Sequence, residues 1–313
     1  MEEKAMSLSK ESAQQYRQID AAFWERYGLS PKEQVVEVGT PATTLRVLEW
    51  GDGPPVFFIH GNAGPGACFA PLIAELSGHR CLVLERPGWG LSSPIDYSQG
   101  EFKSIVASLL ASTLERLGVD KVSIVAGSIG NLWALRFAQA HPSRVERLVL
   151  LGGGPLTSAN VVPKFVKLLR SPLGNIIIRV PERNRMLQQQ LRGLGHGPSL
   201  DSGQIPKVLL DWHMGMSRTT SWTRNERAMV KAIVGPEGFV PGLVLDDAEV
   251  ARIDQPTLMI YGTADPNGSV EIWKRFVGLM PRGSLKLVEN AGHVVWYDDP
   301  TGVGAMVNEF LKG

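Results

Sequence analysis

The chain has 313 residues, 43% of them hydrophobic, so it can bury a large core in one domain or in one domain with an insertion. Its 32 lysines and arginines nearly balance 31 aspartates and glutamates, and a net charge of +1 gives no long-range attraction for nucleic acid or an anionic membrane. The two cysteines argue against a disulfide scaffold, the opening stretch MEEKAMSLSKES lacks the features of a signal peptide, and no apolar run approaches the ~20 residues that span a bilayer. We therefore expect a cytoplasmic protein without nucleic-acid or membrane partners.

The N-terminal part of the chain predicts a helix followed by three strands. Apolar residues recur near the start at roughly helical spacing: Tyr16, Ile19, Ala22 and Phe23. We expect this helix to cover one side of the core. Strands are predicted at 34–38 and 43–50, and the sequence GDGPP at 51–55 predicts a hairpin-like turn into a third strand at 56–60.

From Val56 onward the apolar runs are continuous instead of alternating, which is typical of parallel strands that helices bury on both faces. These runs are VFFIH, RCLVLE, KVSIVAG and VERLVLLG. Helical spacing over 102–117 predicts a crossover helix, and a second helix should follow Ser128 and end before Pro142. The alternation of strands and helices predicts a mostly parallel, doubly wound α/β sheet flanked by helices.

After the glycine run at 152–154 the pattern changes for about a hundred residues, which are rich in Arg, Met, Gln and Trp. We interpret residues 155–252 as a helical cap inserted into a core formed by residues 1–154 and 253–313. Strands return in PTLMIYG and SLKLVE, with a helix around Val270 to Met280 and a last helix from about Thr301.

Ser128 lies in the sequence AGSIG between a predicted strand and a predicted helix. A serine on such a sharp turn projects its Oγ above the sheet edge and requires small neighbours, here Ala126 and Gly130. The same turn directs the backbone N–H of Ile129 to the space beside Oγ, which would supply half of an oxyanion hole. The alternative is that Ser128 is only a helix N-cap.

Two downstream residues favour the catalytic interpretation. Asp265 follows the strand in PTLMIYG, and His293 follows the strand in SLKLVE, so both should lie at the edge where the carboxyl ends of the strands meet. The order Ser, Asp, His is that of a nucleophile, an orienting acid and a general base in this architecture. Taken singly, Asp265 could be a turn former and His293 a structural histidine. His60 is the main rival base, although its position suits bracing a loop better.

The sequence IHGNAGPGA predicts the second oxyanion donor. A strand that runs into His-Gly and a glycine-rich loop can turn the backbone N–H of Asn62 toward the same oxyanion. A phosphate-binding loop is the alternative, but the glycine spacing fits neither of the common phosphate-loop patterns.

Together, the sequences HGNAGPG, ERPGWGLSSP, AGSIGN, YGTADP and AGHVVWYDDP resemble the α/β-hydrolase fold superfamily, across about residues 34–154 and 253–313. The resemblance implies that Ser128 is the nucleophile, Asp265 the acid and His293 the base, with Asn62 and Ile129 as the backbone oxyanion donors. It also places the insertion where that family carries its cap.

Two positions depart from the family pattern and leave the subfamily open. Gly127 stands where His, Gln or Asn is frequent, and Asn131 where Gly is common. A serine nucleophile argues against haloalkane dehalogenases and epoxide hydrolases of this fold, which use aspartate. The resemblance of GPGA and of Trp296 to carbon–carbon hydrolases is offset by the absence of their asparagine before the serine.

The main prediction is therefore a carboxylesterase-like serine hydrolase that acts on an ester or related carbonyl substrate through an acyl-enzyme on Ser128. One alternative is a hydrolase of carbon–carbon bonds in β-diketones or ring-cleavage products. Others are a cofactor-free perhydrolase and a hydrolase-like small-molecule receptor with slow or no turnover.

Aromatic and methionine residues suggest an apolar pocket for a small apolar or mixed acyl substrate. The predicted substrate contacts are Trp212, Met216, Trp222 and Trp296. Packing of the cap on the core explains these side chains equally well. Three arginines of the cap could hold a carboxylate or form a solvated helix face: Arg218, Arg224 and Arg227. No grouping of histidines and carboxylates has metal-ligand spacing, so neither a metal nor another cofactor is predicted.

Overall fold

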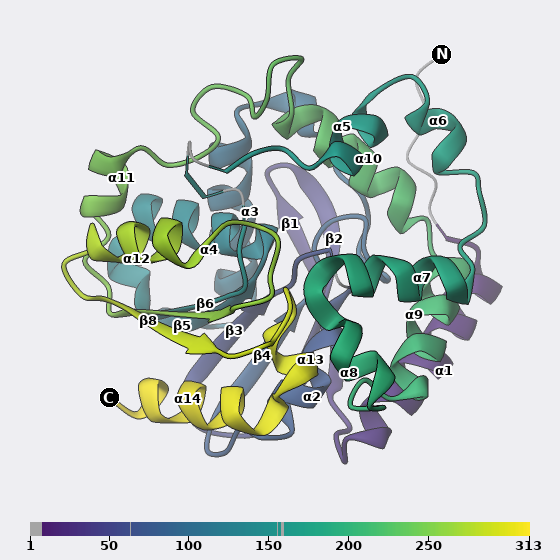
Figure 1. The fold of residues 1–313 in the computed structure, drawn as a ribbon, viewed down its shortest axis with the longest axis horizontal. Helices are drawn as coiled ribbons and strands as arrows, with labels where there is room; N and C mark the ends of the chain where they lie inside the picture. Colours follow the sequence, from purple (N-terminus) through teal and green to yellow (C-terminus); the bar gives the residue numbers. More distant parts are fainter. Residues whose placement is uncertain (1–7, 63, 155, 158–159) are drawn as a thin grey trace.

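The computed structural model describes residues 8–62, 64–154, 156–157 and 160–313 (Figure 1). Its centre is an eight-stranded sheet in the order β1-β2-β4-β3-β5-β6-β7-β8. The strands are β1 Lys32–Gly39, β2 Ala42–Trp50, β3 Pro55–Ile59, β4 Arg80–Leu84, β5 Val122–Gly127, β6 Val145–Leu151, β7 Thr257–Gly262 and β8 Gly283–Val288. β2 pairs antiparallel with β1 and β4, and the pairs from β4 to β8 are parallel. The predicted mostly parallel α/β sheet is confirmed.

The central strands are buried on both faces because successive side chains point to opposite sides of the sheet. Phe57 and Ile59 of β3 belong to one apolar cluster, whereas Val56 and Phe58 belong to a second. Helices cover both faces (Figure 1). These helices are α2 Ala70–Ile73, α3 Phe102–Arg116, α4 Ile129–Ala140, α12 Val270–Gly278, α13 Val295–Asp298 and α14 Pro300–Lys312. Continuous apolar runs in the strands are the direct result of this double burial.

The predicted hairpin between the second and third strands is wrong. β2 pairs with β4, and β3 lies on the far side of β4. The loop 51–54 contacts the residues just before β4. A Cβ on Gly51 would lie 2.5 Å from His79 O, and one on Gly53 would overlap Gly78 O. β3 is buried along almost its whole length, as is typical of a strand between two parallel neighbours, here β4 and β5.

The segment between β6 and β7 folds as helices, which we call the helical insertion. They are α5 Lys164–Arg170, α6 Gly174–Ile177, α7 Asn184–Leu191, a π-helical turn Arg192–His196, α8 Gly197–Asp201, α9 Lys207–Thr219, α10 Trp222–Ile233 and α11 Asp247–Ala251. These helices fall within the predicted cap, 155–252, whose boundaries as a domain stay a prediction. No helix in the described part of the chain is long and apolar enough to cross a membrane.

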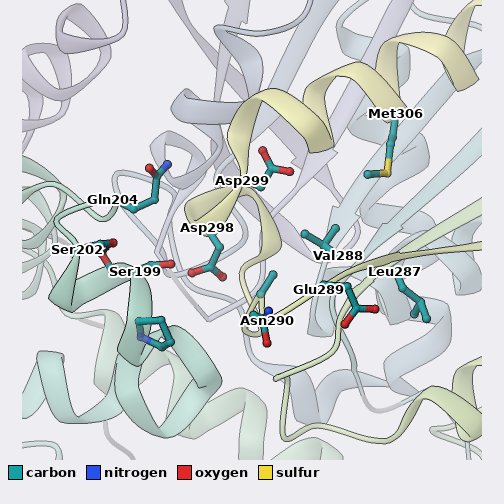
Figure 2. A pocket seen from close by; sticks show the side chains of 12 residues that line it. Ser199, Ser202, Gln204, Leu287, Val288, Glu289, Asn290, Asp298, Asp299 and Met306 are labelled. Atoms are coloured by element: carbon teal, nitrogen blue, oxygen red, sulfur yellow. Dashed lines mark hydrogen bonds between the residues drawn. The ribbon is translucent and has the colours of Figure 1, made fainter.

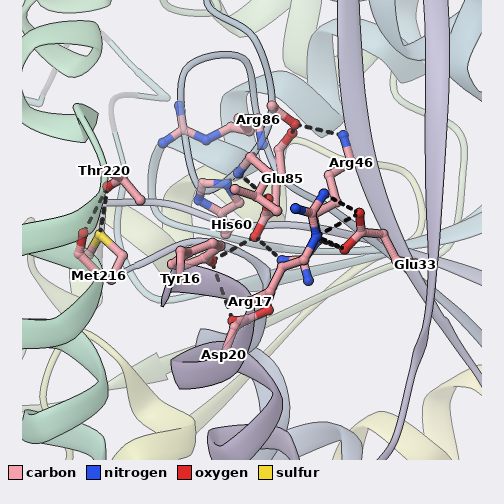
Figure 3. A network of polar contacts seen from close by, with 12 residues as sticks. Tyr16, Arg17, Asp20, Glu33, Arg46, His60, Glu85, Arg86, Met216 and Thr220 are labelled. Atoms are coloured by element: carbon pink, nitrogen blue, oxygen red, sulfur yellow. Dashed lines mark hydrogen bonds and ion pairs between the residues drawn. The ribbon is translucent and has the colours of Figure 1, made fainter. Parts of the chain in front are cut away.

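The N-terminal helix α1 (Lys10–Arg26) packs against α9 of the helical insertion and is fixed to the core by buried charges. Figure 3 shows this network. Tyr16 donates to Glu85 Oε1 (2.7 Å), and Arg46 Nη1 bonds Asp20 Oδ2 (2.7 Å) and Glu85 Oε1 (2.9 Å). Ala22, predicted on the buried face, is exposed, and Asp20 takes part in that face instead. The helix therefore joins insertion and core.

Candidate active site

The turn at Ser128 between β5 and α4 has the strained backbone of a nucleophile turn. Ser128 has φ 56° and ψ −123°, a conformation that costs of order 1–3 kcal/mol and persists only where the surroundings enforce it. A Cβ on Gly130 would overlap Ile59 O, which explains the small residue two positions later. The Ser128 side chain makes no capping bond to α4. Ser128 therefore occupies the N-cap position of α4, but its side chain does not cap the helix.

Ser128, His293 and Asp265 form a continuous chain of hydrogen bonds. His293 Nε2 lies 2.9 Å from Ser128 Oγ, and His293 Nδ1 lies 2.9 Å from Asp265 Oδ2. Because a carboxylate only accepts, Nδ1 carries the proton and Nε2 has the free lone pair. In this tautomer His293 can take the hydroxyl proton of Ser128. The structure thus brings the three predicted residues together, and their catalytic roles stay predictions.

Asp265 is kept ionised by its surroundings, although its side chain is buried. Burial alone would raise the pKa of Asp265, but His293 and two backbone donors outweigh it and lower the pKa from 3.8. Gly153 N donates to Oδ2 and Asn267 N to Oδ1, each at 2.8 Å. The negative charge that orients His293 is therefore stabilised at the site.

The glycine run 152–154, which the sequence presented only as a boundary, lies at the centre of the site. A Cβ on Gly152 would overlap His293 O, one on Gly153 would overlap Asn267 O, and one on Gly154 would lie 2.5 Å from Ser128 O. Each glycine thus allows the close approach of a different loop of the predicted triad. Three successive glycines directly after a buried strand were the signal that could have revealed this.

The loop predicted to hold the second oxyanion donor touches Ser128. A Cβ on Gly61 would lie 2.6 Å from Ser128 Cβ, so the backbone that leads into Asn62 passes beside the serine. Ile129 is the first residue of α4, where amides lack partners within the helix. This arrangement suits the predicted oxyanion hole, which itself stays a prediction.

A buried ion pair connects this loop to the helical insertion. Glu226 of α10 accepts from Asn62 Nδ2 (2.7 Å) and Trp89 Nε1 (3.1 Å), and its Oε2 lies 3.8 Å from Arg86 Nη2. Arg86 in turn donates to Asn62 Oδ1 and Gly61 O, each at 2.9 Å. Burial raises the pKa of Glu226 and lowers that of Arg86. Sequence reasoning missed Glu226, because nothing marks an isolated acid in a helix as a buried partner.

The rival base His60 has both ring nitrogens engaged. Its Nδ1 donates to Gly61 O (2.7 Å) and its Nε2 accepts from Arg86 N (2.9 Å). Burial also lowers the pKa of His60 well below its usual range. His60 therefore braces the loop.

The four predicted substrate contacts are largely packed against other side chains. Trp212 is 2% exposed and stacks on Phe23, and Met216 is fully buried. Trp296 is 3% exposed and donates to Cys68 O (2.7 Å), while Trp222 packs against Trp89. The packing alternative accounts for these contacts, and a substrate role for these four residues stays a prediction.

The three arginines considered for carboxylate binding lie in different surroundings. Arg227 is 4% exposed and donates to Leu169 O (3.0 Å) and Ser171 O (3.2 Å), so it fixes the end of α5. Arg218 is exposed and Arg224 half-buried.

A small cavity of ≈ 40 Å³ lies between the insertion and the loops of the site. It shares Asn62 with the predicted oxyanion loop and Val294 with the loop of His293. Its lining is Asn62, Leu187, Gln190, Leu191, Leu194, Leu209, His213, Val294 and Tyr297. Tyr297 Oη and His213 Nδ1 are buried there without a hydrogen-bond partner among the described residues. Among the described residues that line it, there is no lysine or arginine.

Comparison with known proteins identifies similar sequences and folds. The model of the alpha/beta hydrolase family matches residues 56–305. A 2-hydroxy-6-oxononadienedioate/2-hydroxy-6-oxononatrienedioate hydrolase from Dechloromonas aromatica is 28% identical over 273 residues, 82% of this chain and 86% of the relative. A hydrolase of the same name from Cupriavidus pinatubonensis is 27% identical over 302 residues, covering 88% and 98%.

Two solved structures show the same fold at low identity. Naproxen esterase from Bacillus subtilis superposes with a TM-score of 0.77 at 18% identity, covering 98% of this chain and 100% of that one. A 2-hydroxy-6-oxo-6-phenylhexa-2,4-dienoate hydrolase from Rhodococcus gives 0.70 at 17% identity, covering 91% and 99%.

Proposed function

Because the chain belongs to the alpha/beta hydrolase family, we propose that it hydrolyses the carbon–carbon bond beside the ketone of a 2-hydroxy-6-oxo-dienoate, with Ser128 as nucleophile. The observation that carries this proposal is the Ser128–His293–Asp265 hydrogen-bond chain in a protein whose similar sequences are named 2-hydroxy-6-oxo-dienedioate hydrolases. The sequence alone favoured an ester; these relatives favour the carbon–carbon alternative.

The geometry suits a two-stage reaction on the 2-keto tautomer of such a substrate. Ser128 Oγ bonds to C6 while its proton passes to His293 Nε2, and the negative oxygen is held by the amides of Asn62 and Ile129. Collapse breaks the C5–C6 bond, the electron pair moves through the conjugated system to the 2-keto oxygen, and a proton from His293 completes the 2-hydroxydienoate. Water, deprotonated by His293, then releases the acid from Ser128.

We assign the cavity beside the site to the C6 substituent, because its lining includes Asn62 of the predicted oxyanion loop. Its lining has apolar side chains, amides, a phenol and an imidazole but no cation. A second carboxylate placed there would be desolvated without a counter-ion, which is costly. We therefore expect a 6-methyl substrate to be turned over faster than a dienedioate.

The test follows the loss of dienoate absorbance with two substrates, 2-hydroxy-6-oxohepta-2,4-dienoate and the corresponding nonadienedioate. Hydrolysis of p-nitrophenyl acetate is measured in parallel as the ester substrate. Ser128→Ala should lower turnover at least about 10³-fold and abolish labelling by a fluorophosphonate. The exposed Ser143→Ala is the control and should match the wild type. If Ser128→Ala retains turnover, the proposal is wrong. If the wild-type protein completes only a single slow cycle, the result would indicate a receptor instead.

Ester hydrolysis is the second candidate, favoured by one residue of this chain. Gly127 replaces the asparagine that the carbon–carbon hydrolases have before their serine. If the protein turns over p-nitrophenyl acetate but does not hydrolyse either dienoate, ester hydrolysis would be established and the first candidate excluded.

A further inference from the structure

The loop that carries His293 is held through three successive backbone amides. Gly292 N donates to Asp298 Oδ2 (2.7 Å), His293 N to Leu194 O (2.8 Å) and Val294 N to His196 Nε2 (3.1 Å). Two of these three acceptors belong to the π-helical turn of the helical insertion. The position of the predicted general base is thus set partly from outside the α/β core.

His196 forms a second buried histidine–aspartate pair behind the site. Because its Nε2 accepts from Val294 N, its Nδ1 must carry the proton, which it donates to Asp298 Oδ2 at 2.8 Å. His196 is fully buried. Asp298 lines an open groove of ≈ 580 Å³, which is also lined by Ser199 of α8 and by Ser202, the residue after α8 (Figure 2). The Asp298 carboxylate therefore joins the insertion to the loop of His293 with one oxygen.

Gly195 brings the same turn against both loops of the predicted triad. Gly195 has φ 92°. A Cβ added to it would overlap Ala264 O and would lie 2.9 Å from Gly292 Cα. Ala264 directly precedes Asp265. The turn consequently separates and supports the two loops at once.

We propose that the turn Leu194–His196 holds the loop of His293 in its reactive position and that His196 is its positioning residue. This inference rests on the proposed function, in which His293 activates Ser128. Misplacement of a base by about 1 Å can slow a reaction about 100-fold, so loss of this support should lower reactivity while leaving the nucleophile in place.

The test measures the second-order rate of fluorophosphonate labelling of Ser128 by intact-protein mass, together with the fraction of protein that can be labelled. His196→Ala should slow labelling roughly 10- to 100-fold per reactive serine. His196→Gln, which can still accept from Val294 N, should recover most of that loss. His79→Ala is the matched control, a buried histidine before β4 at the opposite edge of the sheet, and should label at the wild-type rate.

A merely structural role gives a different result. If His196→Ala reduces only the labelled fraction or the melting temperature, while the labelling rate of the reactive fraction is unchanged, the inference is wrong. It is also wrong if His196→Gln is as slow as His196→Ala. Labelling of Ser128→Ala at the wild-type rate would instead overturn the proposed function, independently of the His196 variants.

A separate observation concerns the surface of α5, α6 and the start of α7. Seven of the eight exposed large apolar side chains among the described residues lie between 161 and 186. These seven are Val161, Phe165, Leu168, Leu173, Ile176, Val180 and Met186. In Figure 1, α5 and α6 lie together at one end of the molecule, next to α10. Such a concentration of exposed apolar groups marks an interaction surface.

The same residues concentrate positive charge. Residues 161–186 contain six lysines and arginines and one acid, Glu182, whose side chain is only 9% exposed. This stretch therefore carries +5, and the rest of the chain carries −4 to give the net +1. Lys164 and Lys167 of α5 and Arg179, Arg183 and Arg185 are exposed. The near-zero total charge conceals a segregated distribution.

We infer that this basic apolar surface adsorbs to an anionic lipid surface. Apolar side chains interleaved with lysine and arginine match the boundary between acyl chains and negative head groups, to which each cation is attracted. A second copy of the chain would bring +5 against +5, which disfavours self-association through this surface. This inference does not depend on the proposed function.

The test is co-sedimentation with phosphatidylcholine vesicles that contain or lack phosphatidylglycerol. Binding should require the anionic lipid and weaken at least fivefold in 0.5 M salt because added ions screen the attraction. Phe165→Ser with Leu168→Ser, and Lys164→Gln with Lys167→Gln, should each weaken binding at least fivefold. Val35→Ser, at the exposed apolar residue outside the surface, should not. The inference would be overturned if the protein bound neutral vesicles equally well, or if both double variants bound as the wild type does. It would also be overturned if the protein formed a salt-resistant dimer that the double variant Phe165→Ser, Leu168→Ser dissociates.

Discussion

Gly127, directly before the predicted nucleophile, has no room for a side chain because Trp296 fills the space beside it. A Cβ on Gly127 would lie 2.9 Å from Trp296 Cη2. The indole cannot withdraw easily, since it donates to Cys68 O and stacks on Phe69 at a centroid distance of 5.0 Å. Two residues that the sequence treated separately are therefore one packing solution.

Gly127→Ala should destabilise the protein by about 1–3 kcal/mol, the usual cost of overpacking a core. Urea unfolding of Gly127→Ala, Trp296→Phe and the double variant should show that the second change relieves part of the first. Gly278→Ala is the control, because a Cβ there meets nothing within 4 Å. Additive costs in the double variant would contradict this packing.

The lowered pKa of Asp265 makes part of the stability depend on pH. Because the folded-state pKa lies below the unfolded value near 3.8, the unfolded chain binds more protons between the two values. The stabilisation is therefore complete above pH 3.8 and is lost as pH falls through the folded pKa. The difference in unfolding free energy between wild type and Asp265→Asn should shrink as the pH falls below about 3.8. A difference that grows with acid would contradict the assignment.

Among the elements, α1 links the helical insertion to the core. Phe23 stacks on Trp212 of α9 at 4.7 Å, and the Trp212 ring lies 2.6 Å from the position of a Cβ on Gly64, in the loop that follows Asn62. Trp212 Nε1 also donates to Asp20 (3.4 Å). The contact continues from α1 through α9 to the loop next to Ser128.

Phe23→Ala should cost about 3–5 kcal/mol of unfolding free energy, because it removes a fully buried ring on which another ring stacks. Guanidinium unfolding followed by circular dichroism measures this loss. Val35→Ala, at a residue 63% exposed, should change stability by less than about 0.5 kcal/mol. If Phe23→Ala is as stable as Val35→Ala, the packing of α1 does not contribute to the stability of the fold.

For the molecule as a whole, two buried cysteines report on global opening. Cys68 is 0% and Cys81 2% exposed, and burial raises the pKa of both thiols, that of Cys81 to about 12. A disulfide reagent should react with the native protein at least about 10³-fold more slowly than with the unfolded chain, because only opened molecules expose thiolate. Absorbance of the released thiol measures both rates, and single Cys→Ser variants assign them. Fast reaction of the native protein would contradict the burial.

Most of the fold followed from patterns that are local in sequence. Continuous apolar runs located the parallel strands β3 to β6, and Pro142 marked where α4 stops. The order of the strands in the sheet could not be predicted in this way. The position of β4 between β2 and β3 depends on which neighbours bury β3, and no local pattern encodes that.

The site divided in a similar way. Ser128, Asp265 and His293 could be predicted because each lies in the loop at the carboxyl end of a strand, and these strand ends meet at one edge of the sheet. Glu226 and His196 could not, since their function depends on how the helical insertion docks on the core. Burial and partners of such residues become visible only in three dimensions.

The turn Leu194–His196 constrains how this protein could be recombined with a relative. A chimera that takes its helices from one parent and its α/β core from another would have to keep an acceptor for the Val294 amide and a glycine at the position of Gly195. Crossover points are therefore best chosen so that residues 194–196 and 291–298 come from the same parent. In such a chimera the helical insertion and the loop of His293 have to be inherited together.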